Sequence, residues 1–198
     1  MRIIAGEFRG RRLLAPETDA TRPVTDRVKQ SLFDILMPHL PDVRVYDCFA
    51  GTGSMGLESL SRGSAHATFF ESHRPAAALL RRNIETLAVG RRSTVVTQDL
   101  FHWFDGAPAV PDGQRAGVIF LDPPYRFLRE RPEDLRRLAK QMAERHLAAD
   151  GVIVFRHDAA DKLDLPGLAV ADERTYGGMA LEFLRAAKPE IAPLPPAP

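Results

Sequence analysis

Cysteine and long apolar runs are scarce in this sequence of 198 residues. The single cysteine, Cys48, excludes an internal disulfide and fits a reducing, cytoplasmic location. No apolar run approaches the length of a membrane span, and charged residues interrupt the N-terminus where a signal peptide needs an apolar core. The six histidines and Cys48 lack the spacing of metal ligands. The expectation is a cytoplasmic monomer with no membrane partner and no metal site.

Net charge is also low, at +1, but it is unevenly distributed. Residues 1–30 contain seven Lys/Arg against four Asp/Glu, and residues 126–145 contain the same numbers. Each segment therefore contributes +3, which leaves −5 for the rest of the chain. Two basic segments beside a neutral or acidic pocket suit a polyanionic partner. A helix with mixed charges is equally typical of a solvated face, and both interpretations are open for 126–145.

Alternating strand and helix patterns dominate the chain from residue 43 onward. Short apolar runs predict parallel strands at 45–47, 67–70, 94–96, 118–121 and 151–155, with helices at 57–61, 74–87 and 132–147. Residues 168–176 and 179–184 are joined by Gly177-Gly178 without a helix, which predicts an antiparallel hairpin. The sequence thus predicts an α/β fold, a doubly wound and mostly parallel sheet with a C-terminal antiparallel hairpin.

The two ends of the chain have patterns of their own. Residues 2–14 alternate between apolar and basic around two glycines and predict a small hairpin, and Thr25 or Asp26 is a good N-cap for a helix that ends near Met37. The expected organisation is an N-terminal hairpin and helix over residues 1–40, the main α/β domain over 41–187, and a proline-rich tail without a fold over 188–198.

An apolar run that ends in Asp122-Pro123-Pro124-Tyr125 is the most informative stretch of the sequence. A short strand buried on both faces places Asp122 at its carboxyl end, where open α/β sheets bind ligands. The prolines stiffen the turn. A carboxylate, the Pro123 carbonyl and the Tyr125 ring together could hold a flipped-out nucleobase by its exocyclic amine. An ordinary strand-ending Asp-Pro turn is the alternative.

Glycines recur between the first strand and its helix, as Gly51-x-Gly53-x-x-Gly56, and Glu71 follows 20 residues after Gly51. This spacing is typical of a dinucleotide site in which the acid holds ribose hydroxyls. Asp47 would repel a pyrophosphate but suits the ammonium of an amino acid, and Asp99 is placed to accept from an adenine amine. An amino acid, a ribose and an adenine occur together in S-adenosylmethionine.

The segment from Asp47 to Gly56 resembles motif I of class I methyltransferases, and residues 122–125 resemble motif IV of those that methylate amines. Met1-Arg-Ile-Ile-Ala-Gly6, Arg9-Gly-Arg-Arg-Leu13, Arg22-Pro-Val-Thr-Asp-Arg27, Leu57-Glu-Ser-Leu-Ser-Arg-Gly63 and Tyr176-Gly177 extend the similarity over about residues 1–185. Together they resemble the RsmD family. That family methylates the N2 amine of one guanine in bacterial 16S ribosomal RNA, so the resemblance implies 16S rRNA, or the small-subunit ribonucleoprotein, as partner.

The resemblance also implies roles for individual residues. Residues 1–40 would contact RNA and act as a lid over a Rossmann-like methyltransferase domain. Implied catalytic residues are Asp122, Pro123, Pro124 and Tyr125. Implied S-adenosylmethionine-binding residues are Asp47, Phe49, Ala50, Gly51, Thr52, Gly53, Gly56, Glu71, Ser72, Asp99 and Leu100. Implied RNA-binding residues are Arg9, Arg11, Arg12, Arg22 and Arg27.

Three positions depart from the family pattern, namely Val24, His73 and Arg156. The first two leave the chemistry intact, whereas Arg156 could change the pocket wall or the RNA contact. Three alternatives stay open on the residues alone. The protein could methylate another amine of DNA or RNA, adenine N6 or cytosine N4. It could instead be a non-catalytic RNA-binding assembly factor, or an NAD(P) oxidoreductase.

Overall fold

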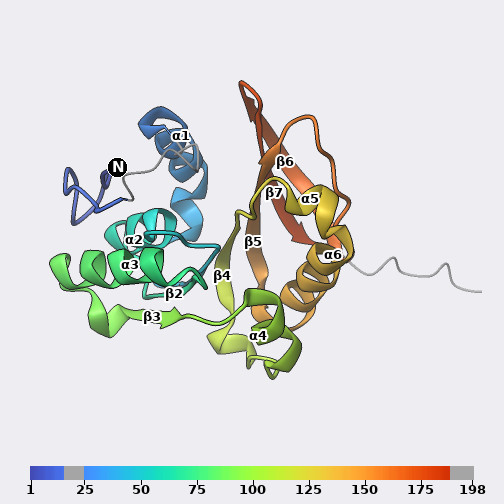
Figure 1. Ribbon diagram of the computed structural model, residues 1–198, viewed down its shortest axis with the longest axis horizontal. Coiled ribbons are helices and arrows are strands. Elements are labelled where there is room, and N and C mark those ends of the chain that lie inside the picture. The colour runs from blue at the N-terminus through green and yellow to red at the C-terminus, as the bar shows by residue number, and fades with distance from the viewer. Residues whose placement is uncertain (16–24, 188–198) are drawn as a thin grey trace, which may run out of the picture.

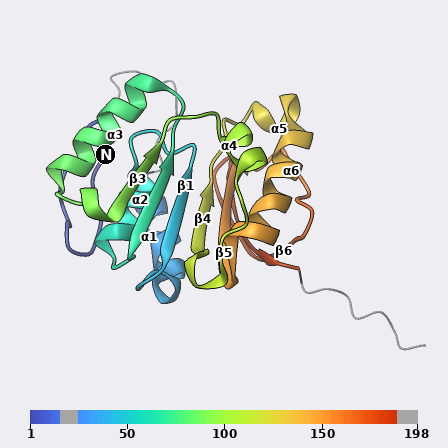
Figure 2. The ribbon, with the colours of Figure 1, turned by 90° about the horizontal axis from the view of Figure 1, so that it is seen from below.

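The computed structural model describes residues 1–15 and 25–187, and within these ranges no helix is long and apolar enough to cross a membrane. A seven-stranded sheet in the order β3-β2-β1-β4-β5-β7-β6 forms the middle layer. Helices cover both of its faces, α1 to α3 on one side and α4 to α6 on the other (Figures 1 and 2). The predicted α/β class, the mostly parallel sheet and the antiparallel hairpin are confirmed.

The elements follow one another in the predicted alternation. The strands are β1 Arg44–Cys48, β2 His66–Phe70, β3 Ser93–Val96, β4 Ala116–Leu121, β5 Leu147–Asp158, β6 Leu168–Tyr176 and β7 Met179–Ala186. The α-helices are α1 Asp26–Leu36, α2 Ser54–Ser61, α3 Arg74–Thr86, α4 Leu100–Gly106, α5 Phe127–Glu130 and α6 Pro132–Gln141. Shorter helical turns are η1 Met37–His39, η2 Gly90–Arg92, η3 Asp112–Gln114 and η4 Met142–His146.

Strand side chains alternate between two apolar layers, as the period of two demands. Val45, Val118 and Phe120 point to the side of α1 and α2, and the same side continues past β2 to α3. Ile119 and Leu121 point to the opposite side, where α4, α5 and α6 pack. Because β4 is buried on both faces over its whole length, it lies at the centre of the molecule.

Several boundaries differ from the prediction. The helix expected over 132–147 ends at Gln141 and continues as one π-helical turn, and β5 begins at Leu147 rather than at 151. Helix α2 begins at Ser54, three residues before the predicted start. The N-terminal hairpin is paired through a single bridge, Arg2 to Arg12, with no regular strand. Backbone hydrogen bonds such as Ile3 N–H to Arg11 and Leu13 N–H to Met1 support that bridge, and Ile3 and Leu13 are buried in the core between α2 and α3.

The strand register sets the position of the site. Cys48 of β1 lies beside Phe70 of β2 and Leu121 of β4, and Leu121 lies beside Phe155 of β5. The residues that follow these strand positions therefore meet at one edge of the sheet. Strands β1 to β3 are added toward one side of the sheet, and β4 and β5 are added on the other side of β1. Open α/β sheets bind their ligands at such a switch point, here between β1 and β4.

Candidate active site

The glycine turn after β1 is held by two acidic side chains from neighbouring strand ends. Glu71 accepts a hydrogen bond from the Gly51 N–H at 2.7 Å, and Asp47 accepts one from the Gly56 N–H at 2.8 Å. Gly53 adopts φ 87° and is the N-cap of α2; a Cβ there would lie 2.4 Å from a Leu80 methyl, so only glycine fits. The turn is thus fixed before any ligand enters.

Asp47 is almost completely buried, with 2% of its surface exposed. Burial raises the pKa of its carboxyl group to about 7, and the negative charges of Asp122 and Glu71 add to the rise, while the Gly56 hydrogen bond opposes it. A cationic ligand group beside Asp47 would relieve this cost. The carboxylate therefore holds the turn and carries a buried charge that a cation could neutralise.

Glu71 and its neighbours form the second part of the predicted cofactor site. Both oxygens of Glu71 accept backbone N–H groups, from Gly51 and from His73, at 2.7 Å each, which orients the carboxylate rigidly. Ser72 beside it is exposed. Each carboxylate oxygen has a second lone pair with which it can accept from a sugar hydroxyl.

The remaining predicted cofactor residues lie along the same edge. Ala50 and Thr52 are buried within the turn, and Phe49 adopts φ 62°, a strained conformation for a bulky residue. Asp99 is exposed and caps α4 through the His102 N–H at 3.0 Å, and Leu100 is buried beneath it. Asp99 therefore has a structural role that explains its position without an adenine.

Asp122 directly follows β4, and its carboxylate is paired with Arg156 of β5. The Arg156 Nε atom donates to Asp122 Oδ1 at 2.6 Å, and the two side chains are only 16% and 21% exposed. Burial raises the pKa of Asp122, and the guanidinium opposes that rise. The Arg156 Cζ atom also lies 6.0 Å from the centroid of the Tyr125 ring. Arg156, which the sequence marked only as a departure, is thus part of the site.

The turn after Asp122 is short and closed. Pro123 is buried and Pro124 is exposed, and the Pro124 carbonyl accepts from the Phe127 N–H at 2.8 Å as α5 begins. Phe127 in turn packs at 6.0 Å from Phe49, edge to face. This contact joins the glycine turn to the Asp-Pro-Pro-Tyr turn, and the sequence had not predicted it.

An aromatic wall extends from this contact. Phe101 of α4 lies 6.0 Å from Phe49 and 6.2 Å from Phe127, and the Arg131 guanidinium lies 4.0 Å above the Phe101 ring. The three rings cover the end of the sheet between α4 and α5. The available signal was an aromatic residue after three of the strands, since Phe49, Phe101 and Phe127 follow β1, β3 and β4.

A buried charge network supports the glycine turn from beneath. Lys29 of α1 and Glu58 of α2 are 1% and 0% exposed and form an ion pair at 3.0 Å. Lys29 also donates to Ser54 Oγ at 3.1 Å, and Glu58 accepts from Arg62 Nε at 2.9 Å. Burial lowers the pKa of Lys29 and the Glu58 charge opposes it. The apolar periodicity of α1 gave no sign of this network, because lysine is rarely buried.

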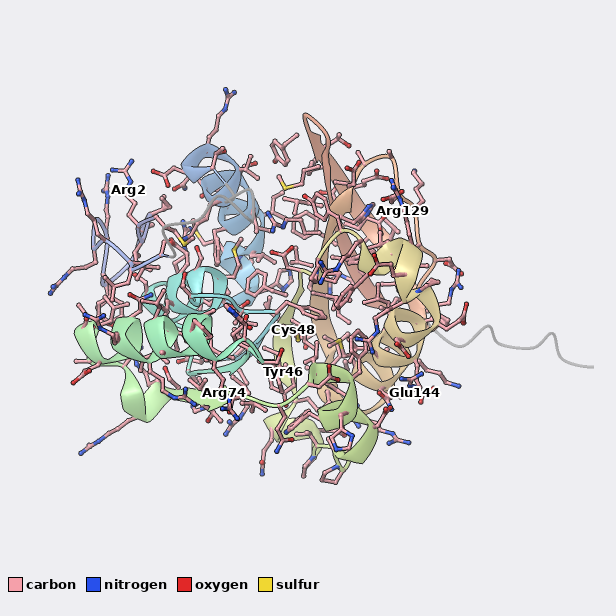
Figure 3. All side chains as sticks on the ribbon, viewed as in Figure 1. Arg2, Tyr46, Cys48, Arg74, Arg129 and Glu144 are labelled. Carbon is pink, nitrogen blue, oxygen red and sulfur yellow. The ribbon has the colours of Figure 1, made fainter. Side chains whose placement is uncertain are left out.

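Four of the five predicted RNA-binding arginines lie within the described residues. Arg9, Arg11, Arg12 and Arg27 are exposed and form no ion pair with any described residue, while Arg22 lies outside the described residues. Figure 3 places Arg2, in the same N-terminal segment, far from Arg129 of α5 on the other side of the molecule. The two basic segments therefore do not lie side by side.

Most basic side chains of the second segment, 126–145, are ion-paired, with acids inside the segment and outside it. Arg129 pairs with Asp161, Arg137 with Asp105, and Lys140 with Glu144. Further pairs join Arg126 to Glu130, Arg131 to Asp134 and Arg136 to Glu133. The solvated-face interpretation fits this segment better, whereas Arg9, Arg11 and Arg12 of the first segment have no ion partner among the described residues.

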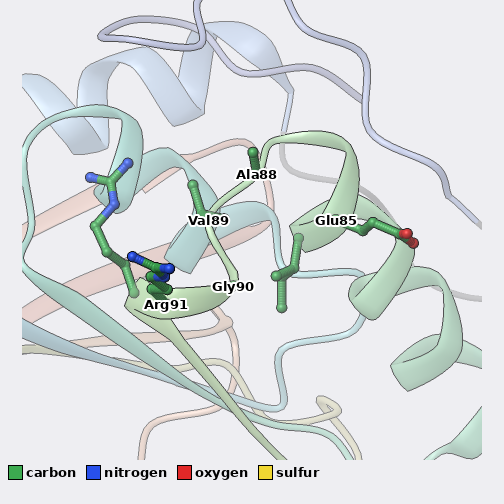
Figure 4. Close-up of a pocket in the computed structure, with 7 residues that line it drawn as sticks. Glu85, Ala88, Val89, Gly90 and Arg91 are labelled. Atoms are coloured by element: carbon green, nitrogen blue, oxygen red, sulfur yellow. The ribbon is translucent and has the colours of Figure 1, made fainter.

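One cavity lies away from these groups and a second borders the Asp99 turn. One of about 530 Å³ is lined by residues of the α3–β3 connection, among them Glu85, Ala88 and Arg91 (Figure 4). It lies at the amino end of β3, the opposite edge of the sheet from Asp122. A smaller one of about 300 Å³ is lined by Gln98, His102 and Trp103 with residues 106–108. In the described residues no group of three or more His, Cys, Asp and Glu side chains could hold a metal.

Comparison with known proteins settles the family. A family model described as Conserved hypothetical protein 95 matches residues 1–185. The chain belongs to this family, the RsmD family. A Bacillus subtilis member, YlbH, whose name assigns it provisionally to the rRNA methyltransferases, is 35% identical over 182 residues, 89% of this chain and 94% of YlbH.

Two further matches come from Escherichia coli, one by sequence and one by structure. Ribosomal RNA small subunit methyltransferase D is 40% identical over 126 residues, which span 64% of this chain and 61% of the relative. The solved structure of yhhF, provisionally titled a methyltransferase, superposes with a TM-score of 0.79 at 30% identity, over 95% of this chain and 99% of yhhF. The class I methyltransferase fold expected from the motifs is therefore confirmed.

Proposed function

We propose that this RsmD-family protein transfers a methyl group from S-adenosylmethionine to the N2 amine of a guanine in small-subunit 16S rRNA. One observation carries the proposal. The glycine turn after β1 and the Asp-Pro-Pro-Tyr turn after β4 follow neighbouring strand ends at the switch point of the sheet. The names of the Bacillus subtilis and Escherichia coli relatives point to rRNA as the substrate class.

The residues around the glycine turn fit the donor group by group. Asp47, buried and short of a counter-charge, would hold the ammonium, and Glu71 would accept from the ribose hydroxyls. Asp99 and Leu100 follow β3 at the same edge and would border the adenine. When bound there, the donor supplies an electrophilic methyl group on a sulfonium.

The second turn would prepare the acceptor nitrogen. The lone pair of a guanine N2 amine is delocalised into the ring, so the amine is a poor nucleophile. Asp122 and the Pro123 carbonyl would accept hydrogen bonds from the two N–H groups of the amine and so turn its lone pair toward the methyl group. Tyr125 would stack on the base. Positioning supplies most of the rate, because transfer disperses a charge that already exists.

The N-terminal region would carry the RNA. Arg9, Arg11 and Arg12, with Arg22 and Arg27, would contact phosphates, and residues 1–40 would form a lid over the methyltransferase domain of residues 41–187. Their support is the exposed charge of Arg9, Arg11, Arg12 and Arg27, which pair with no acid in residues 1–15 and 25–187. The working form would be a cytoplasmic monomer.

The decisive experiment compares wild type with Asp122→Asn, which keeps the shape of the side chain and removes its charge. Labelled S-adenosylmethionine is supplied with naked 16S rRNA, assembled small subunits, or duplex DNA. Wild type should label RNA at guanine N2, and Asp122→Asn should lose at least about a hundredfold in rate with little change in donor affinity. Labelling of DNA, of adenine or of cytosine would replace the proposed substrate, and absence of any transfer would favour a binding protein.

A further inference from the structure

Arg156 contacts the side chain that the proposed reaction depends on. It follows Phe155 within β5 and lies beside Asp122, because Leu121 of β4 is the register partner of Phe155. Its Nε donates to Asp122 Oδ1 at 2.6 Å, and its Nη1 lies 3.8 Å from the Met179 sulfur of β7. The guanidinium is therefore held from two strands and is directed at one carboxylate oxygen.

The pair is much less exposed than the ion pairs on the surface of the molecule. Arg174 and Asp172 on the edge strand β6, for example, lie 2.9 Å apart with side chains 54% and 36% exposed, whereas Arg156 and Asp122 are 16% and 21% exposed. An exposed pair is screened by water and contributes little. A largely buried pair strongly affects the ionisation and orientation of its members.

We propose that Arg156 is a positioning residue for methyl transfer: it binds Asp122 through Oδ1 and leaves Oδ2 as the oxygen that accepts from the target amine. The proposal rests on the proposed function, since it assigns Asp122 to the amine. Among the described residues, Arg156 is the partner bonded to this carboxylate, so the division between the two oxygens follows from the 2.6 Å contact.

A second consequence concerns charge. Burial favours the protonated form of Asp122, while Arg156 favours the carboxylate; Asp47 of β1 is the other acid nearby, and the charge of Asp122 raises its pKa. Tyr125 also faces Arg156. A protonated Asp122 would direct its O–H group toward the N–H groups of the amine, so the amine would lose its hydrogen-bond acceptor. Arg156 therefore extends the range of pH over which the amine can be held.

The test compares Arg156→Gln and Arg156→Lys with the control Arg174→Gln, which removes an arginine from an exposed pair. The kcat/KM for rRNA methylation is measured from pH 5.5 to 9.5. Arg156→Gln should lose about tenfold more activity at pH 6 than at pH 9, because the acidic limb of its profile moves to higher pH. Arg156→Lys should recover most of the loss, and Arg174→Gln should follow wild type.

A second measurement separates this proposal from the proposed function. The carboxyl ¹³C resonance of Asp122, assigned with Asp122→Asn, is titrated in wild type and Arg156→Gln without RNA. An upward move of its midpoint in Arg156→Gln supports the proposal even where no RNA is methylated. An unchanged midpoint, a loss that is equal at all pH values, or a loss confined to KM with a reduced salt dependence would each overturn it, the last assigning Arg156 to an RNA phosphate.

Discussion

Replacing Gly6 by alanine should detach the N-terminal segment from α2, whereas the same replacement at Gly10 should not. Both glycines adopt φ 82°, so both substitutions impose the same left-handed backbone strain. They differ in surroundings. A Cβ on Gly6 would lie 1.8 Å from the Ser61 carbonyl oxygen, but a Cβ on Gly10 would have no atom within 4 Å.

The structure gives the size of the difference. The shared strain costs about 1 kcal/mol at either position. At Gly6 the segment must also move away from Ser61, which accepts from the Glu7 N–H at 2.7 Å and from the Phe8 N–H at 2.9 Å, and whose hydroxyl donates to the Ala5 carbonyl at 2.6 Å. At about 1 kcal/mol for each hydrogen bond, the loss adds roughly 3 kcal/mol.

Urea unfolding checks the prediction. Gly10→Ala should lower the free energy of unfolding by about 1 kcal/mol and Gly6→Ala by about 4 kcal/mol, relative to wild type. Limited proteolysis supplies a local measurement, since a detached segment is cleaved faster near its arginines. If the two variants are equally stable and equally resistant to cleavage, the segment does not dock on α2 as described.

Two further predictions concern charge. The pKa of Asp47 is raised to about 7 without ligand, and the donor's ammonium favours the carboxylate. The affinity for S-adenosylmethionine should therefore rise from pH 6 to pH 8, and binding should release a proton. Calorimetry in two buffers measures that proton, and Asp47→Asn should show neither effect. Replacing Arg9, Arg11 and Arg12 together by glutamine should reduce the salt slope of rRNA binding by about two to three, whereas a control triple at Arg129, Arg136 and Arg137, whose side chains are ion-paired, should change it by less than about one. Equal slopes for the two triples would remove the N-terminal segment as the RNA surface.

Strand ends were predictable because their signal is local. Four apolar residues followed by Asp122 and two prolines define both a buried strand and the point where it ends. The same holds for Glu71 after β2. Since parallel strands end at one edge, sequence alone brought Asp47, Glu71 and Asp122 together, and the structure agrees.

Contacts between distant segments were not predictable, because they depend on register. Arg156 meets Asp122 only because β5 pairs with β4 at Leu121 and Phe155, 34 residues apart. Helix α4 was missed because its helix-capping residue, Asp99, was interpreted as an adenine contact. A sequence pattern shows only the type of a residue and its neighbours along the chain. It therefore cannot decide between two roles that suit the same side chain, such as a helix cap and a ligand contact.

Further connections to the glycine turn come from residues outside the motifs that define it. Asn83 of α3 is buried, and its amide nitrogen donates to the Thr52 carbonyl at 3.0 Å and to the Leu14 carbonyl at 3.1 Å. Lys29 joins the same turn, at Ser54, to the Arg2 carbonyl at 3.0 Å. Because both links bind the N-terminal segment and the turn through one side chain, displacement of the segment removes support from the turn. The N-terminal segment and the glycine turn are therefore linked, so that movement of one displaces the other. Gly6→Ala should weaken the binding of S-adenosylmethionine as well as lower the stability.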